Sequence, residues 1–138
     1  MPQFSQGSLE KLSECHDELQ LLFKTVIQTY DCTILVGHRD QAAQEAAFNA
    51  GKSKLHYPYG NHNATPSNAV DAAPYPIDWE DTNRFTFFAG YVLGIADRLF
   101  AAGIMKHRIR WGGAWSSIEE LNGKGVLNDL CHFELCKI

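Results

Sequence analysis

The stretch HNATPSNAVDAAPYPIDW, residues 62–79, decides how the chain folds and raises a question about its chemistry. It begins as a loop rich in Asn, Ser and Pro and continues as AVDAAPY, an apolar run that predicts a buried strand over residues 69–75. Asp71 interrupts this run. An ionised carboxylate among apolar neighbours is costly unless it is paired or bound to a metal, so the sequence predicts a partner for Asp71.

Helices and strands alternate on both sides of this stretch. Apolar residues at helical spacing predict three helices, over about 8–30, 40–51 and 79–102. Ser8 is the expected N-cap of the first helix. Short apolar runs predict further strands at 33–37, 108–115 and 132–136, separated by loops at 52–68 and 116–129. This order favours an α+β fold in which helices pack on one mainly antiparallel sheet.

Length and composition narrow the classes of function. The 138 residues, 45% of them hydrophobic, fit a single globular domain over 1–138. The net charge of -4 and the absence of a basic cluster argue against a nucleic-acid partner. We find no signal peptide and no apolar run long enough for membrane insertion, so we expect synthesis and folding in a cytoplasm. None of the four cysteines forms a CxxC pair, which favours reduced thiols over a zinc–thiolate site.

Two histidines could join Asp71 in a metal site. His62 lies in the loop before the predicted strand at 69–75, and His132 begins the last predicted strand. Two imidazoles and one carboxylate are a familiar ligand set for catalytic zinc, which keeps a fourth position open for water. The alternative is that each residue has a separate structural role, and spacing alone does not bring the three together.

Three further polar residues are candidates for the same site. Asp129 precedes His132 by three positions and could act as a general base beside a metal, or could cap a loop. Arg39 leaves the strand predicted at 33–37 and could bind a carboxylate or a carbonyl oxygen, or form a surface ion pair. Gln44, about one helical turn beyond Arg39, is a candidate for lining the same cleft.

Four segments together resemble a known family. They are VGHRDQAAQEAAFNAGKSK (36–54), HNATPSNAVDAAPYPIDW (62–79), RIRWGGAW (108–115) and NDLCHFEL (128–135). Their order resembles the VanY-type D-alanyl-D-alanine carboxypeptidase family, and more closely its phage-endolysin branch of L-alanyl-D-glutamate peptidases. No single segment is specific, but the ordered set is. The resemblance implies the zinc fold shared by D-Ala-D-Ala peptidases, lysostaphin-like peptidases and the hedgehog N-terminal domain.

The resemblance also implies roles for individual residues. Zn²⁺ would be held by His62, Asp71 and His132, which would explain the carboxylate in the apolar strand. Asp129 would deprotonate the attacking water and then protonate the leaving amine. Arg39 would bind substrate and stabilise the oxyanion, and the cleft wall would include Trp111 and Trp115.

The function implied is that of a zinc-dependent endolysin. We expect it to hydrolyse the L-alanyl-D-glutamate bond in the stem peptide of bacterial peptidoglycan, as a monomer that waits in the host cytoplasm for holin-type release. Three alternatives remain open: a D-alanyl-D-alanine carboxypeptidase, a cytoplasmic dipeptidase and a catalytically inert zinc-binding module. The presence of Asp129 argues against the inert module, because a purely structural zinc needs no base.

Overall fold

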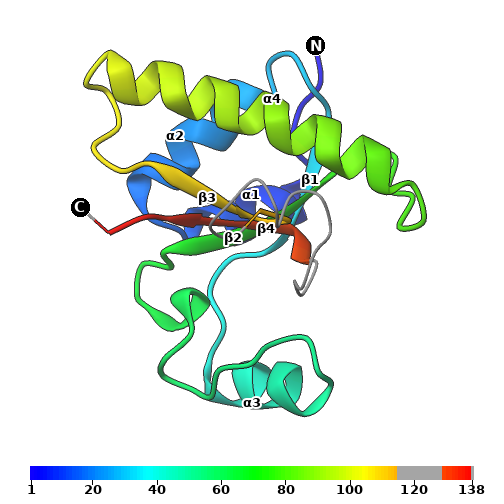
Figure 1. The fold of residues 1–138 in the computed structure, drawn as a ribbon, viewed down its shortest axis with the longest axis vertical. Helices are drawn as coiled ribbons and strands as arrows, with labels where there is room; N and C mark the ends of the chain where they lie inside the picture. Colours follow the sequence, from blue (N-terminus) through cyan, green and yellow to red (C-terminus); the bar gives the residue numbers. More distant parts are fainter. Residues whose placement is uncertain (115–128, 138) are drawn as a thin grey trace.

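A four-stranded antiparallel sheet organises the chain. The computed structural model describes residues 1–114 and 129–137 (Figure 1). In spatial order the strands are β1 (Cys32–Val36), β2 (Ala69–Pro74), β4 (Asp129–Leu135) and β3 (Ile109–Gly112), and each neighbouring pair is antiparallel. Together with the helices, this sheet confirms the α+β fold predicted from the sequence.

The helices lie on different sides of the sheet. They are α1 (Gln6–Ser13), α2 (Asp17–Val26), α3 (Gln41–Asn49) and α4 (Thr82–Ala101), with a 3₁₀ turn η1 (Asn61–Asn63). Figure 1 shows α2 and α4 over one face of the sheet and α3 on the opposite side. No helix in the described ranges is long and apolar enough to cross a membrane.

The alternation of side chains along β2 and β4 gives the sheet two unlike faces. Val70 pairs with Phe133, and both belong to the hydrophobic core under α2 and α4. The Phe133 ring meets those of Phe23 and Phe88 edge-on, with centroids 5.5 and 6.1 Å apart. Asp71 pairs with His132 in the same ladder, so both side chains point to the other face.

The predicted helix over 8–30 is wrong as a single element. His16 N donates to Ser67 O, and Ser67 N donates to Glu14 O, both at 2.9 Å, so the backbone leaves the helix to pair with the segment before β2. His16 Nδ1 then accepts from Glu18 N at 3.0 Å and caps α2. Apolar spacing continues across this break, which is why the sequence pattern did not reveal it.

The prediction that Ser8 caps the first helix is wrong. Ser5 is the cap residue, and its hydroxyl accepts from Ser8 N at 3.2 Å. Ser8 is buried, and its Oγ accepts from Ile34 N at 3.1 Å, which ties α1 to β1. A serine near a helix start therefore joins two elements here.

The last strand begins earlier than predicted. β4 starts at Asp129, which was assigned to a loop over 116–129, so this residue has a strand position beside the candidate ligands. Backbone pairing with Gly112 of β3 extends the strand to this point. The rest of that predicted loop and Trp115 lie outside the described residues.

Candidate metal centre

The structure brings His62, Asp71 and His132 together from three elements. Asp71 on β2 and His132 on β4 are direct cross-strand partners, and η1 carries His62 over them. Asp71 Oδ1 lies 3.2 Å from both His62 Nε2 and His132 Nδ1, and these two nitrogens are 3.3 Å apart. All three residues are buried, so the donor atoms face one another rather than solvent.

Hydrogen bonds on the far side of each ring fix the two histidines. His62 Nδ1 donates to Gly37 O at 2.7 Å, and His132 Nε2 donates to Glu134 Oε1 at 2.8 Å. Glu134 is held in turn by Asn61 Nδ2 at 2.9 Å. The ring nitrogens facing Asp71 are thereby left available as ligands, an arrangement typical of metal-binding histidines.

Glu134 is a site residue that sequence reasoning missed. The signal was available, because alternation along a strand places residues two apart on one face, and Glu134 follows His132 by two positions.

The three donor atoms fit a zinc ion. Ligands at about 2.0–2.1 Å on a tetrahedron lie about 3.3 Å from one another, close to the spacings of these donors. Two neutral imidazoles and one carboxylate also match the donor types of catalytic zinc.

The electrostatics of the site favour a cation. Burial alone would raise the pKa of Asp71, but hydrogen bonds from His132 and His62 outweigh burial and lower it well below its usual range. Burial lowers the pKa of His132, yet bonds to Asp71 and Glu134 raise it to about 9. The first shift keeps Asp71 ionised, and the second shows that the surrounding carboxylates stabilise positive charge at His132.

Asp129 lies next to the three donors. Its Oδ2 is 3.8 Å from His132 Nδ1, and Cys131 Sγ donates to its Oδ1 at 3.7 Å. Burial and the nearby charge of Asp71 raise the pKa of Asp129, which makes the carboxylate a better proton acceptor. The backbone is tight here: a Cβ on Gly112 would stand 2.1 Å from Asp129 O, so glycine permits the close approach of β3.

Arg39 reaches the site from the end of β1. Its Nη2 lies 3.4 Å from Asp71 Oδ2, the carboxylate oxygen that the histidines leave unused. Gln44 is 1% exposed, and its Nε2 donates to Ser53 Oγ and Leu55 O at 3.0 and 2.7 Å. Its Oε1 lies 3.5 Å from Arg39 Nη1. Gln44 therefore contacts both Arg39 and the loop that follows α3, and its contact with substrate stays a prediction.

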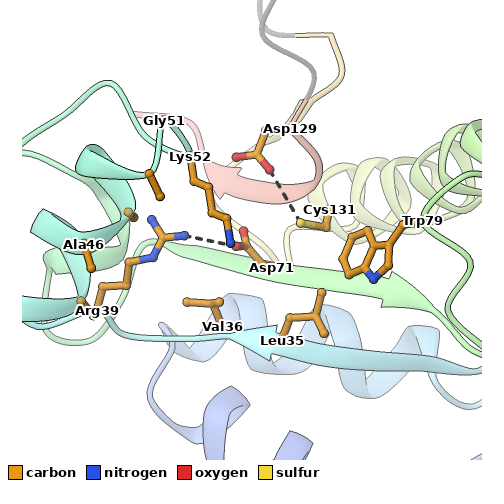
Figure 2. Close-up of a pocket in the computed structure, with 13 residues that line it drawn as sticks. Leu35, Val36, Arg39, Ala46, Gly51, Lys52, Asp71, Trp79, Asp129 and Cys131 are labelled. Atoms are coloured by element: carbon orange, nitrogen blue, oxygen red, sulfur yellow. Dashed lines mark hydrogen bonds and ion pairs between the residues drawn. The ribbon is translucent and has the colours of Figure 1, made fainter.

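A cavity of about 910 Å³ opens over the site, between α3 and the sheet (Figure 2). Asp71, one of the three candidate ligands, and Asp129, the candidate base, both line it. Sequence reasoning missed two of its other lining residues, Lys52 and Trp79. The loop composition around Lys52 gave no indication of a side chain directed at the site.

Trp111 does not line this cavity. It is 4% exposed, belongs to the hydrophobic core and donates from Nε1 to Leu130 O at 2.8 Å. The structure therefore places Trp111 in the core beside β4, and its predicted contribution to substrate binding stays a prediction.

Two other groups in the described ranges have metal-ligating side chains close together. Asp71, Asp129 and Cys131 form one, which overlaps the candidate centre. His16, Glu18 and His107 form the other. In that group Glu18 accepts from His107 Nδ1 at 2.7 Å and from two backbone N–H groups, so its oxygens already serve to join α2 to the segment before β3.

Known proteins resemble this chain in sequence and in fold. The family model described as phage L-alanyl-D-glutamate peptidase matches residues 1–136. The fold resembles the crystal structure of the Serratia marcescens L-Ala D-Glu endopeptidase ChiX, with a TM-score of 0.72 and 22% identity over 96% of this chain and 89% of that chain. No curated protein sequence matches the chain. Since the family model spans nearly the whole sequence and confirms the resemblance carried by the four motifs, the chain belongs to the phage L-alanyl-D-glutamate peptidase family.

Proposed function

We propose that this peptidase hydrolyses the L-alanyl-D-glutamate bond of peptidoglycan with a zinc ion held by His62, Asp71 and His132. The observation that carries the proposal is the convergence of three donor atoms, at the spacing zinc requires, beside a cavity that Asp71 and Asp129 line. Family membership supplies the substrate, because the family acts on the L-alanyl-D-glutamate bond.

The residues around the cavity divide the chemistry between them. A bound zinc ion supplies a Lewis acid, which acidifies water and polarises a carbonyl. Asp129 accepts the proton of the attacking water and delivers it to the departing amine nitrogen, a task that its raised pKa suits. Arg39 donates hydrogen bonds to the carbonyl oxygen as negative charge develops there.

The supporting residues hold these groups in place. Gly37 and Glu134 keep the histidine rings oriented, and Gln44 lies behind the Arg39 guanidinium. Such outer contacts matter because catalytic geometry tolerates displacements of only about half an ångström.

Digestion of purified peptidoglycan tests the proposed function. We expect zinc-loaded protein to generate new N-termini on D-glutamate, EDTA to stop the reaction and added Zn²⁺ to restore it. Release of free D-alanine without those termini would instead support a D-alanyl-D-alanine carboxypeptidase. Zinc binding with no cleavage of any kind would support an inert module.

We further propose that the enzyme acts as a monomer and reaches the wall from the host cytoplasm after holin-type release. The cell wall is the site of action of the family, so an enzyme made inside the host must pass the inner membrane. Expression with and without a membrane-permeabilising partner tests this route, since we expect lysis only with the partner. Sedimentation at working concentration tests the oligomeric state.

A further inference from the structure

The two ends of the cavity over the candidate centre differ in chemical character. Figure 2 shows Arg39 and Lys52 on one side of Asp71 and Trp79 on the other, with all four residues lining one space. The Lys52 side chain extends from the end of α3 toward the middle of the cavity (Figure 2). Trp79 is 60% exposed and stacks on Phe85, with ring centroids 5.4 Å apart. The cleft therefore has a cationic end and an aromatic end.

The backbone holds Lys52 at a defined position. Gly51 takes a positive φ of 76° after α3, and the backbone N–H groups of Lys52 and Ser53 both donate to Ala47 O, at 2.9 and 3.2 Å. Gln44 Nε2 also holds Ser53 Oγ at 3.0 Å. Although the Lys52 side chain is exposed, it starts from a helix end that is closed by hydrogen bonds.

The two cations at this end differ in their partners. Arg39 is paired with Asp71 at 3.4 Å. Within residues 1–114 and 129–137, no carboxylate forms an ion pair with Lys52. An ammonium group that faces a substrate cavity and has no such partner there is available to bind an anion brought by the substrate.

The proposed substrate brings that anion. A glutamyl residue has two carboxyl groups, and only one of them can be linked to the next residue of the peptide. The other remains a free carboxylate within a few bonds of the scissile nitrogen. We propose that Lys52 binds this free carboxylate, and thereby selects an acidic residue on the amine side of the bond and directs the L-alanyl side toward Trp79.

This inference rests on the proposed function. Two matched peptide substrates distinguish a failure of the inference from a failure of the proposed function. One contains L-alanyl-D-glutamate with its free carboxylate, and the other has that carboxylate replaced by a primary amide. We expect wild type to prefer the carboxylate peptide in kcat/KM by about tenfold, as a charge-assisted hydrogen bond allows. Lys52→Gln should raise KM for the carboxylate peptide by a similar factor, leave kcat nearly unchanged and leave the amide peptide unaffected. Lys52→Arg should keep the preference.

Lys54→Gln is the matched control, because it makes the same change of charge at an exposed neighbour that does not line the cavity. It should leave both substrates unaffected. Equal cleavage of the two peptides by wild type, or an equal loss on both in Lys52→Gln, would overturn this inference alone. Cleavage of neither peptide by zinc-loaded wild type would overturn the proposed function and this inference with it.

Discussion

The two faces of the central sheet are built from the same strands and serve opposite purposes. On one face Val70 and Phe133 meet the apolar surfaces of α2 and α4. The next pair in the same ladder, Asp71 and His132, lies on the face that opens into the cavity. Buried apolar area stabilises the first face, whereas hydrogen-bonded polar groups occupy the second at a cost in desolvation. Alternation thus lets a stable core hold a polar site rigidly.

The region around α3 contrasts with the core in a similar way. Hydrogen bonds hold this region in place: Asn63 Nδ2 donates to Arg39 O at 3.1 Å and to Gln44 Oε1 at 3.2 Å. The face of α3 turned to the cavity consists of alanines, which leave space rather than fill it. The substrate side is therefore held open by hydrogen bonds, while the opposite side is closed by packing.

Asp129→Asn should have the largest effect, and it should impair the polar face of the sheet without affecting the core face. The variant keeps the shape of the side chain but loses the proton acceptor, so we expect kcat to fall by about 10²–10⁴-fold. Zinc content and the thermal midpoint should stay close to those of wild type, because the core face is untouched. Assays on a synthetic L-alanyl-D-glutamate peptide, with metal analysis of the same sample, measure both. Activity within tenfold of wild type would exclude Asp129 as the base.

Phe133→Ala should break the core face. Phe133 is fully buried, so its removal should lower the free energy of unfolding by about 3–5 kcal/mol in urea titrations. Phe87→Ala is the control, because Phe87 on α4 is 67% exposed and its loss should cost less than about 0.5 kcal/mol. A small effect at Phe133 would mean that the face under α2 and α4 is not the main source of stability.

Glu134→Gln should weaken the polar face without unfolding it. The amide can still accept from His132 Nε2 but no longer carries the charge that strengthens this ligand, so we expect zinc affinity to fall by about tenfold. Competition with a chromogenic chelator measures the affinity. Glu80→Gln, an exposed change of the same kind, should bind zinc like wild type. Identical zinc affinities for both variants would mean that Glu134 does not strengthen the His132 ligand.

Glu18→Gln should have the smallest effect, and one that depends on pH. Burial acts to raise the pKa of Glu18, but hydrogen bonds from His107 and from backbone N–H groups lower it. A carboxyl group whose pKa is lowered by folding adds to the free energy of unfolding at any pH above its pKa in the unfolded state. This contribution is lost as the pH falls through the pKa of the folded state. We expect Glu18→Gln to cost about 1 kcal/mol at pH 7 and nothing at a pH below the folded value, measured by urea unfolding at both pH values. A difference that persists in acid would contradict the role of the charge.

The sequence allowed the sheet and the three candidate ligands to be predicted, for different reasons. Apolar runs and alternation indicated the strands, whereas the grouping of His62, Asp71 and His132 came from the resemblance of four ordered segments. Spacing could not group them, because contact between β2 and β4 depends on a register that residues far apart in the chain establish together.

The wrong or incomplete predictions share one physical cause. The break at His16 comes from pairing with Ser67, and the strand position of Asp129 comes from pairing with β3. Lys52 lines the cavity because α3 and its following loop fold back on the site. Each of these features is a tertiary contact that a local pattern does not contain.

Anomalous X-ray diffraction at the zinc edge, from crystals of the zinc-loaded protein, tests the central claim most directly. We expect a strong peak within ligand distance of His62 Nε2, Asp71 Oδ1 and His132 Nδ1, next to Asp129. A zinc ion held instead by His16, Glu18 and His107, with no density between His62 and His132, would contradict it.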